Sequence, residues 1–190
     1  FWRRLPGAAE RPGVEWCWIR VRTVNGWLYL ASVYSPSDIS VPMAGVAADA
    51  LRQHVDAFND KDDCVGVLVV GDFNSTWYDD QDLLERRGMG NCGSTPVGKG
   101  RRWRDRLVGD AVVVNDRLVR PHAAADVHTS TWATRLGANG ARSTCIDYGV
   151  WFGPPGNIAS VCIRDATGPD HRTLRIRLSE LGAEVEALER

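Results

Sequence analysis

The chain has few lysines, no paired cysteine motif and no long apolar run. Lys61 and Lys99 are the only lysines among 23 basic residues, so arginine carries nearly all of the positive charge. Arginine favours bidentate contacts with phosphate, although a biased base composition of the coding sequence would enrich it equally well. The net charge of -1 gives the whole chain no general attraction to nucleic acid or membrane, so any electrostatic steering must come from local patches.

The cysteines argue against two common architectures. There are 5, an odd number, and no two of them have the C-x-x-C spacing of a zinc or redox site. Most lie in apolar, strand-like stretches, where cysteine behaves as a small hydrophobe. These are Cys17, Cys64, Cys145 and Cys162. We therefore expect a nuclear or cytoplasmic protein that is not secreted, with neither a disulfide framework nor a structural zinc.

Signals for targeting and membrane insertion are also missing. We find no signal peptide, and no apolar run is long enough to cross a bilayer, so we expect no membrane role. The length of 190 residues and a hydrophobic fraction of 44% fit one domain with a substantial core. We expect a single domain over residues 1–190, in which residues 180–190 form a charged tail or linker.

The most informative stretch is an apolar run that stops at a glycine and is followed at once by polar groups. Val65–Val70 predicts a fully buried strand. Gly71 lets the backbone leave the sheet, and Asp72 and Asn74 then lie where sheet-based enzymes commonly gather their chemistry. These side chains suit a hard cation, a phosphate oxygen or an attacking water. By itself the stretch is equally consistent with an Asx-turn that serves only the local backbone.

Strands predominate elsewhere. Asn25-Gly26 predicts a tight hairpin between strands at 14–23 and 27–35, with its arginine-bearing face in water. Trp16, Trp18, Arg20 and Arg22 share that face. The spacing of apolar residues predicts an amphipathic helix over 46–58. Further strands are expected at 111–115, 129–134, 143–152, 158–164 and 172–178, with a short helix at 79–87. This strand-rich, mostly antiparallel pattern is typical of α+β layers.

One basic cluster contains an aromatic residue. Arg101, Arg102, Arg104 and Arg106 follow Lys99 closely, and Trp103 lies among them. A solvated helix face is the simpler interpretation. The functional interpretation is a phosphate-backbone contact with an aromatic side chain beside it. Arg101, Arg102, Trp103 and Arg104 are the candidate nucleic-acid contacts.

Three short polar clusters each lie at the end of a predicted strand. They are Asp72 with Asn74, Asp147 in Ile146-Asp147-Tyr148, and Asp170 with His171. Together they hold what phosphoester cleavage by water needs. His171 can act as a base or stabilise the phosphate, and a carboxylate such as Asp147 can hold the imidazole in one tautomer. Asp170 can help to bind Mg²⁺, which would neutralise developing charge.

The order of these motifs resembles that of the endonuclease/exonuclease/phosphatase superfamily, which includes pancreatic deoxyribonuclease. The middle motif is matched by Gly71-Asp72-Phe73-Asn74, the late motif by Ile146-Asp147-Tyr148, and the closing Ser-Asp-His motif by Pro169-Asp170-His171. A tyrosine-proline strand end is matched by Tyr34-Ser35-Pro36. The resemblance covers residues 14–178. Within the superfamily, the stretch 131–147 is most similar to the endonuclease domain of non-LTR retrotransposons.

The resemblance implies a four-layer α/β/β/α sandwich of the deoxyribonuclease I-like type. It also implies Mg²⁺-dependent phosphodiester hydrolysis, with Mn²⁺ as an alternative metal. His171 would be the catalytic histidine, oriented by Asp147, and Asp72 would activate water or transfer a proton. Asn74 would be a ligand of phosphate and metal. Tyr34 would contact the phosphate, and Asp170 would be a metal-site carboxylate. DNA would be the substrate, and a reverse transcriptase domain of the same polyprotein would be a partner.

The chain departs from the family pattern in two respects. Family members begin with a longer N-terminal part, whose Glu is the main Mg²⁺ ligand, and neither Glu10 nor Glu15 stands in such a context. We therefore expect an N-terminally truncated piece that leaves part of a sheet unpaired. Pro169 replaces the serine beside the catalytic pair. Two alternatives stay open: a phosphodiesterase or phosphatase acting on inositol phosphates or sphingolipids, and a catalytically dead copy that at most binds DNA.

Overall fold

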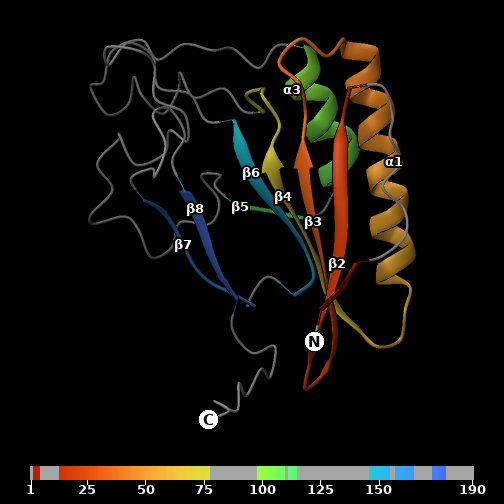
Figure 1. Ribbon diagram of the computed structural model, residues 1–190, viewed down its shortest axis with the longest axis vertical. Coiled ribbons are helices and arrows are strands. Elements are labelled where there is room, and N and C mark those ends of the chain that lie inside the picture. Colours follow the sequence, from red (N-terminus) through yellow and green to blue (C-terminus); the bar gives the residue numbers. More distant parts are fainter. Residues whose placement is uncertain are drawn as a thin grey trace.

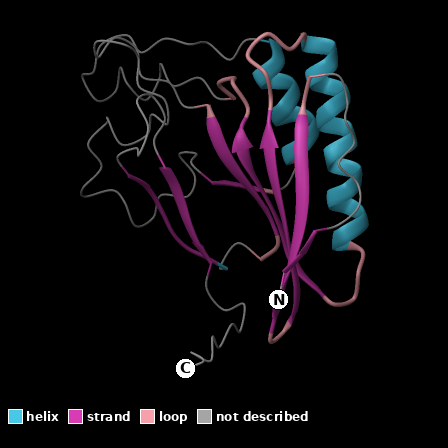
Figure 2. Ribbon diagram, in the orientation of Figure 1, coloured by secondary structure: helices cyan, strands magenta, loops and turns pink. Residues whose placement is uncertain are grey.

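In the computed structural model, the residues described are 2–4, 13–77, 98–109, 111–114, 146–154, 157–164 and 173–178. Strands predominate along them, and the helices fall between β3 and β5 (Figures 1 and 2). In chain order the elements are β1 (Trp2–Arg4), β2 (Glu15–Thr23), β3 (Gly26–Tyr34), α1 (Val41–Asn59), β4 (Cys64–Asp72), α3 (Gly98–Trp103), η1 (Arg104–Val108), β5 (Val112–Val114), β6 (Asp147–Phe152), β7 (Ile158–Arg164) and β8 (Thr173–Leu178).

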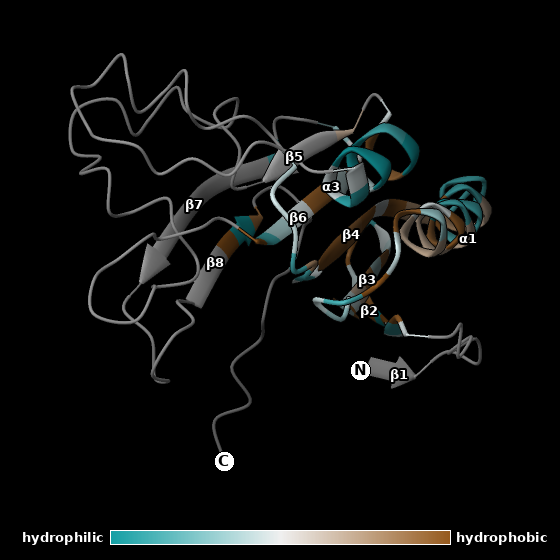
Figure 3. Ribbon diagram, turned by 90° about the horizontal axis from the view of Figure 1, so that it is seen from above, coloured by the Kyte–Doolittle hydropathy of each residue, from teal (hydrophilic) through white to brown (hydrophobic). Residues whose placement is uncertain are grey.

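The described strands form a six-stranded sheet in the order β1-β2-β3-β4-β6-β5 and a two-stranded sheet of β7 and β8. β3 and β4 are parallel, and the other neighbours are antiparallel. Helices α1 and α3 cover one face of the larger sheet, and β8 approaches the opposite face (Figure 3). There Ile176 and Leu178 pack against Leu28, Leu68 and Trp151. The α+β class predicted from the sequence is confirmed.

The hairpin of β2 and β3 fixes the register of the sheet. Its turn consists of Val24 and Asn25, one residue earlier than the predicted pair, and Thr23 faces Gly26 across it. Gly26 has a φ of 145°, and a Cβ there would lie 2.2 Å from the carbonyl oxygen of Asp63. Only glycine fits this position. Counting outward from the turn, the pairing ends at Glu15 opposite Tyr34.

The prediction that the arginine-bearing face of this hairpin meets water is wrong at its tryptophans. Trp16 and Trp18 are buried in the main core. The edge of the Trp18 ring packs on Phe58 of α1 at a centroid distance of 4.8 Å, and both tryptophans approach His54 edge-on. Helix α1 covers this part of the face because its apolar stripe needs an apolar partner. His54 of α1 is thus packed against two buried tryptophan rings.

Helix α1 begins at Val41, five residues before the predicted start. Ser40 caps it by accepting a hydrogen bond from the backbone N–H of Met43, and Pro42 lies in the first turn, where its missing N–H is tolerated. Its buried side is built largely from small residues, which allow a close approach to the sheet. The buried residues are Ala44, Gly45, Ala47, Ala48, Leu51 and Val55.

Several other elements agree with the sequence within a few residues. Strand β7 has the predicted bounds, β8 starts one residue later than expected, and β6 starts four residues later. The predicted helix at 79–87, the strand at 129–134 and the tail at 180–190 lie outside the described residues. Within the described part of the chain, no helix combines the length and the apolar character that crossing a bilayer requires.

Candidate functional site

Three predicted site residues lie side by side at one end of the central sheet, the upper end in Figure 1. β3 ends at Tyr34 and β4 ends at Asp72, and these two residues are register partners. β6 begins at Asp147, which is the register partner of Asp72 on the other side. Neighbouring strands lie about 4.8 Å apart and cross-strand partners share a face. The sheet therefore aligns a phenol and two carboxylates in one row.

Asn74 is held against this row by its own backbone and side chain. It has a positive φ of 45°, and its N–H donates to Oδ1 of Asp72 at 2.8 Å. Its Nδ2 donates to Oδ2 of Asp72 at 3.1 Å and to the carbonyl oxygen of Ser35 at 2.9 Å. The Asx-turn that the sequence left open as an alternative is thus present, although the Asn74 side chain also bonds beyond its own segment, to Ser35. Because both amide protons are used, Oδ1 of Asn74 is the side-chain atom left to contact a cation.

Backbone hydrogen bonds join the segments that carry the row. The N–H of Ser35 donates to the carbonyl oxygen of Asp72 at 2.8 Å, which joins the chain after β3 to the end of β4. The N–H of Phe73 donates to the carbonyl oxygen of Ile146 at 2.9 Å, which joins the chain after β4 to the start of β6. The sheet pairing therefore continues one step beyond the strands, and it fixes the candidate residues relative to one another.

A cavity of about 370 Å³ opens beside the two carboxylates. Its lining comes from β4, β6 and β8, and Asp72 and Asp147 are the charged groups in it. The remaining lining residues are Leu68, Val70, Gly71, Tyr148 and Ile176. The apolar side chains in this lining lower the local dielectric constant and so strengthen electrostatic interactions at the carboxylates.

The oxygen donors at this end of the sheet fit a hard divalent cation. Asp72 offers a carboxylate and Asn74 a carboxamide oxygen, and the Asp147 carboxylate lies beside them as the register partner of Asp72. Among the described residues there is no group of three or more His, Cys, Asp or Glu side chains that could hold a metal ion. Mg²⁺ is commonly bound by one or two carboxylates, with waters and substrate phosphate completing the octahedron, so this donor set suits it. Asp170 and His171 lie outside the described residues.

Glu15 is a residue that the sequence reasoning set aside. It is exposed, and it is the register partner of Tyr34 on β2. It therefore extends the row by one strand, on the same face as Asp72 and Asp147. No motif identifies it. Its pairing with Tyr34 follows from the observed turn at Val24 and Asn25, whereas a turn at Asn25-Gly26 would place Glu15 opposite Pro36.

The basic cluster forms the helix α3 and the π-helical turn η1. Arg101 and Arg102 are exposed, and neither has an ion pair within the described residues. Arg104 pairs with Asp105 at 2.8 Å, Arg106 pairs with Asp49 of α1, and the Lys99 ammonium donates to the carbonyl oxygen of Ser37. The two exposed guanidinium groups of α3 are therefore the ones in this cluster available to an external anion.

Trp103 is not a surface residue like these arginines. The prediction that it contacts nucleic acid is therefore wrong. The Trp103 side chain is fully buried, and its ring meets Phe73 edge-on at 5.0 Å. A buried ring has no free face on which a base could stack. Gly100 lies on the same side of α3, where a Cβ would come 1.9 Å from the carbonyl oxygen of Thr76. Trp103 thus anchors α3 to the chain that follows β4.

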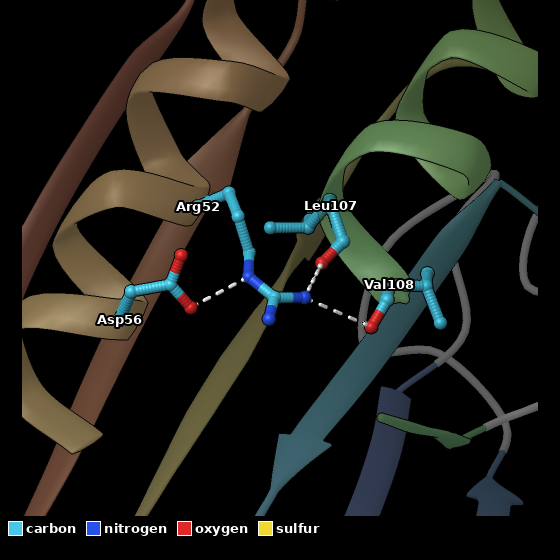
Figure 4. Close-up of polar contacts among 4 residues, drawn as sticks. All are labelled: Arg52, Asp56, Leu107 and Val108. Carbon is cyan, nitrogen blue, oxygen red and sulfur yellow. Dashed lines mark hydrogen bonds and ion pairs between the residues drawn. The ribbon is translucent and has the colours of Figure 1, made fainter. Parts of the chain in front are cut away.

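Arg52 anchors the other end of this helical pair (Figure 4). Its Nη1 donates to the carbonyl oxygens of Leu107 and Val108, each at 3.3 Å, and its Nε donates to Asp56 at 2.7 Å. The guanidinium also lies 5.3 Å from the ring centroid of Phe152. A cation at the carbonyl end of a helix is favourable. The basic helices are therefore tied to α1 and to β6 as well as to the chain after β4.

One solved structure supplies a comparison for this arrangement. It is the "Endonuclease domain of TRAS1, a telomere-specific non-LTR retrotransposon", with a TM-score of 0.59 and 14% sequence identity. The match covers 94% of this chain and 67% of that one. Protein-family models and curated protein sequences give no match. The fold expected from the resemblance in the sequence is thus confirmed, because the chain shares the fold of that domain.

Proposed function

We propose that the chain is a Mg²⁺-dependent DNA endonuclease of the non-LTR retrotransposon type, which hydrolyses a phosphodiester bond by attack of water. The observation that carries the proposal is the row of Tyr34, Asp72 and Asp147 across three adjacent strands, with Asn74 bonded to Asp72. The fold shared with a retrotransposon endonuclease domain supports it. A nick with a 3′-hydroxyl would give a reverse transcriptase domain of the same polyprotein a primer.

Each residue of the row has a role in this reaction. Asp72 accepts a proton from, or orients, the attacking water, and Asn74 presents its Oδ1 to the metal while fixing the Asp72 carboxylate. Tyr34, whose side chain is 49% exposed, donates its hydroxyl to a phosphate oxygen. Asp147 would orient His171 as the catalytic histidine, and Asp170 would help to hold the metal. When bound, Mg²⁺ neutralises charge on the phosphate.

The DNA backbone would be held by the exposed guanidinium groups of α3. Arg101 and Arg102 can each bind a phosphate in a bidentate fashion, with Arg104 next to them along the chain. The contacts of Trp103 with Phe73 and of Gly100 with Thr76 hold this helix next to the segment that carries Asn74. A phosphate contact on α3 would therefore set the register of the DNA relative to the row.

Nicking of supercoiled plasmid tests the proposal. Incubation with Mg²⁺ should convert the plasmid to the open-circular form, and EDTA should abolish the conversion. Asp72→Asn and His171→Ala should each lower the rate at least roughly a hundredfold. Asp62→Asn, which changes an exposed carboxylate away from the row, is the matched control and should nick at the wild-type rate. Nicking that survives EDTA, or that survives Asp72→Asn, would overturn the proposal.

Competition identifies the substrate class in the same assay. Linear duplex DNA should inhibit nicking at far lower phosphate concentrations than inositol phosphates do, because several arginines engage a continuous backbone. Stronger inhibition by inositol phosphates would move the assignment to a phosphatase-type substrate.

A further inference from the structure

Tyr148 follows Asp147 on β6 and faces the other way. Successive side chains of a strand point to opposite faces, so Tyr148 lies on the helix-covered side, where it is only 2% exposed. Its hydroxyl oxygen accepts a hydrogen bond from the backbone N–H of Trp77 at 3.1 Å. The two rings are stacked, with centroids 4.3 Å apart and planes inclined by 10°.

These contacts close a short loop that carries a proposed site residue. Residues 73–77 start at Phe73, whose N–H donates to the carbonyl oxygen of Ile146, and end at Trp77, whose N–H donates to Tyr148. The two acceptor residues stand on either side of Asp147 in the sequence. Asn74, with its positive φ, lies between the two anchored ends. A left-handed residue of this kind persists where its surroundings fix it.

We propose that Tyr148 is a positioning residue that holds Asn74 in place relative to Asp72 and Asp147. The inference deepens the proposed nuclease function and rests on it. A buried amide without an acceptor is unfavourable, so the Trp77 N–H binds the loop to the tyrosine hydroxyl more specifically than apolar packing alone would. The Tyr148 ring packs against the Trp77 ring, and the hydrogen bond to the Tyr148 hydroxyl fixes the orientation of the Trp77 backbone.

The loop of residues 73–77, which Tyr148 clamps through its ring and its hydroxyl, also contacts helix α3. The Phe73 ring packs edge-on against Trp77 at 4.6 Å and against Trp103 of α3 at 5.0 Å. Gly100 of α3 approaches the carbonyl oxygen of Thr76, a residue of the clamped loop, too closely for any side chain. Arg52 and Asp49 also hold α3 and η1 from the side of α1. Loosening of the loop at Trp77 should therefore affect Asn74 more than the proposed phosphate contacts.

Replacement of Tyr148 by phenylalanine tests the clamp, because it removes the acceptor and keeps the ring. In Tyr148→Phe, the amides of Asn74 and Trp77 should exchange with solvent roughly tenfold faster or more, as measured by NMR. Tyr29→Phe is the matched control, since Tyr29 is equally buried on the same face and stacks on Phe58. It should leave both amides at the wild-type rate. Unchanged exchange in Tyr148→Phe, or uniformly faster exchange across β2 and β3, would overturn the inference.

Nicking kinetics give a second readout that a purely structural role would not produce. Tyr148→Phe should lower kcat roughly tenfold while KM changes less than about twofold, since the variant misplaces a reacting group and not the binding surface as a whole. Equal kcat in the two tyrosine variants would overturn the positioning role. A wild-type chain that fails to nick would overturn the proposed function, and the exchange rates would then still decide whether Tyr148 holds Asn74.

Discussion

Asn74 has a φ of 45°, a backbone conformation that residues other than glycine seldom adopt. Asparagine tolerates it better than most, because its side chain can bond to nearby backbone groups. Here that side chain bonds to both Ser35 and Asp72. The residue thus combines a conformational role with the chemical one that we propose for it, and substitutions can separate the two.

We expect Asn74→Ala to lose both roles and Asn74→Gly to lose only the chemical one. Alanine in the left-handed region costs about 1–2 kcal/mol, whereas glycine adopts it freely. Urea unfolding should therefore find Asn74→Gly more stable than Asn74→Ala, while both lose nicking activity at least roughly a hundredfold. Recovery of activity in the glycine variant would mean that the carboxamide has no part in the reaction.

Two groups remote from the row make the stability of the fold depend on pH in the alkaline range. Burial raises the pKa of the Cys64 thiol. Burial, followed by the nearby Asp63 carboxylate, raises the pKa of the Tyr29 hydroxyl. Because the folded state holds these protons more tightly than the unfolded state does, their stabilising contribution is complete below the unfolded pKa. It is lost as the pH rises through the folded pKa.

For Cys64 this loss begins near the unfolded pKa of about 8.5. We predict that the free energy of unfolding falls as the pH rises from that value, and that it falls less steeply in Cys64→Ala. Urea titrations at a series of pH values measure both slopes, with Cys17→Ala as the control for loss of another half-buried thiol. The same slope in all three proteins would contradict the assignment to Cys64.

At the scale of elements, α3 and η1 are held from three sides. Trp103 packs on Phe73, Arg106 pairs with Asp49, and Arg52 donates to the carbonyl oxygens at the end of η1. This leaves Arg101 and Arg102 exposed on a fixed support. Exposed arginines on a fixed helix lose less conformational freedom on binding than they would on an unsupported loop.

We expect Arg101→Gln together with Arg102→Gln to weaken DNA binding in a salt-dependent way. Each phosphate contact contributes roughly 0.9 to the slope of log affinity against log salt, so the double variant should lower the slope by about two. Fluorescence anisotropy at several salt concentrations measures it. The control is Arg22→Gln, an exposed arginine that lies over Trp27 on β3. An equal decrease of the slope in the control would mean that only net charge matters.

Gly100→Ala tests how closely α3 must approach the clamped loop. An alanine Cβ would lie 1.9 Å from the carbonyl oxygen of Thr76, so the backbone of one segment has to move. We predict a loss of about 1–3 kcal/mol in the free energy of unfolding, as expected for overpacking in a dense interior. Gly98 of the same helix serves as control, because a Cβ there would meet only the exposed side chain of Val41, at 3.1 Å, and no backbone atom. In thermal unfolding, the midpoint temperature of Gly98→Ala should fall far less than that of Gly100→Ala.

For the whole molecule, the sequence predicted local features more accurately than the faces of the elements. The hairpin turn was predicted within one residue, and the buried strand after Val65 and the bounds of β7 were also predicted closely, because all three depend largely on residues close in sequence. Trp16 and Trp18 share a strand face with two arginines, and alternation alone could not decide whether water or α1 meets that face. Packing against Phe58, which lies forty residues further on, decided it.

The residues of the candidate site also fall into two groups, those that a local motif identifies and those that only tertiary contacts place. The motifs around Asp72 and Asp147 were recognisable because each is a short run of residues whose chemistry is readable in order. Glu15 was not, because its place in the row depends on pairing with Tyr34 across the hairpin. Trp103 was assigned to the surface because its neighbours in sequence are arginines, whereas the helix turns its ring inward.

The sequence by itself predicted which residues can carry phosphoester chemistry, and it placed Asp72 and Asp147 at strand ends, as the structure does. It did so because strand ends and turns are encoded by short-range rules of backbone geometry and hydrogen bonding. Only the tertiary structure decided that Tyr34, Asp72 and Asp147 form one row, and that Tyr148 clamps the loop bearing Asn74. Those facts depend on contacts between residues more than thirty positions apart, whose register and packing no local pattern specifies.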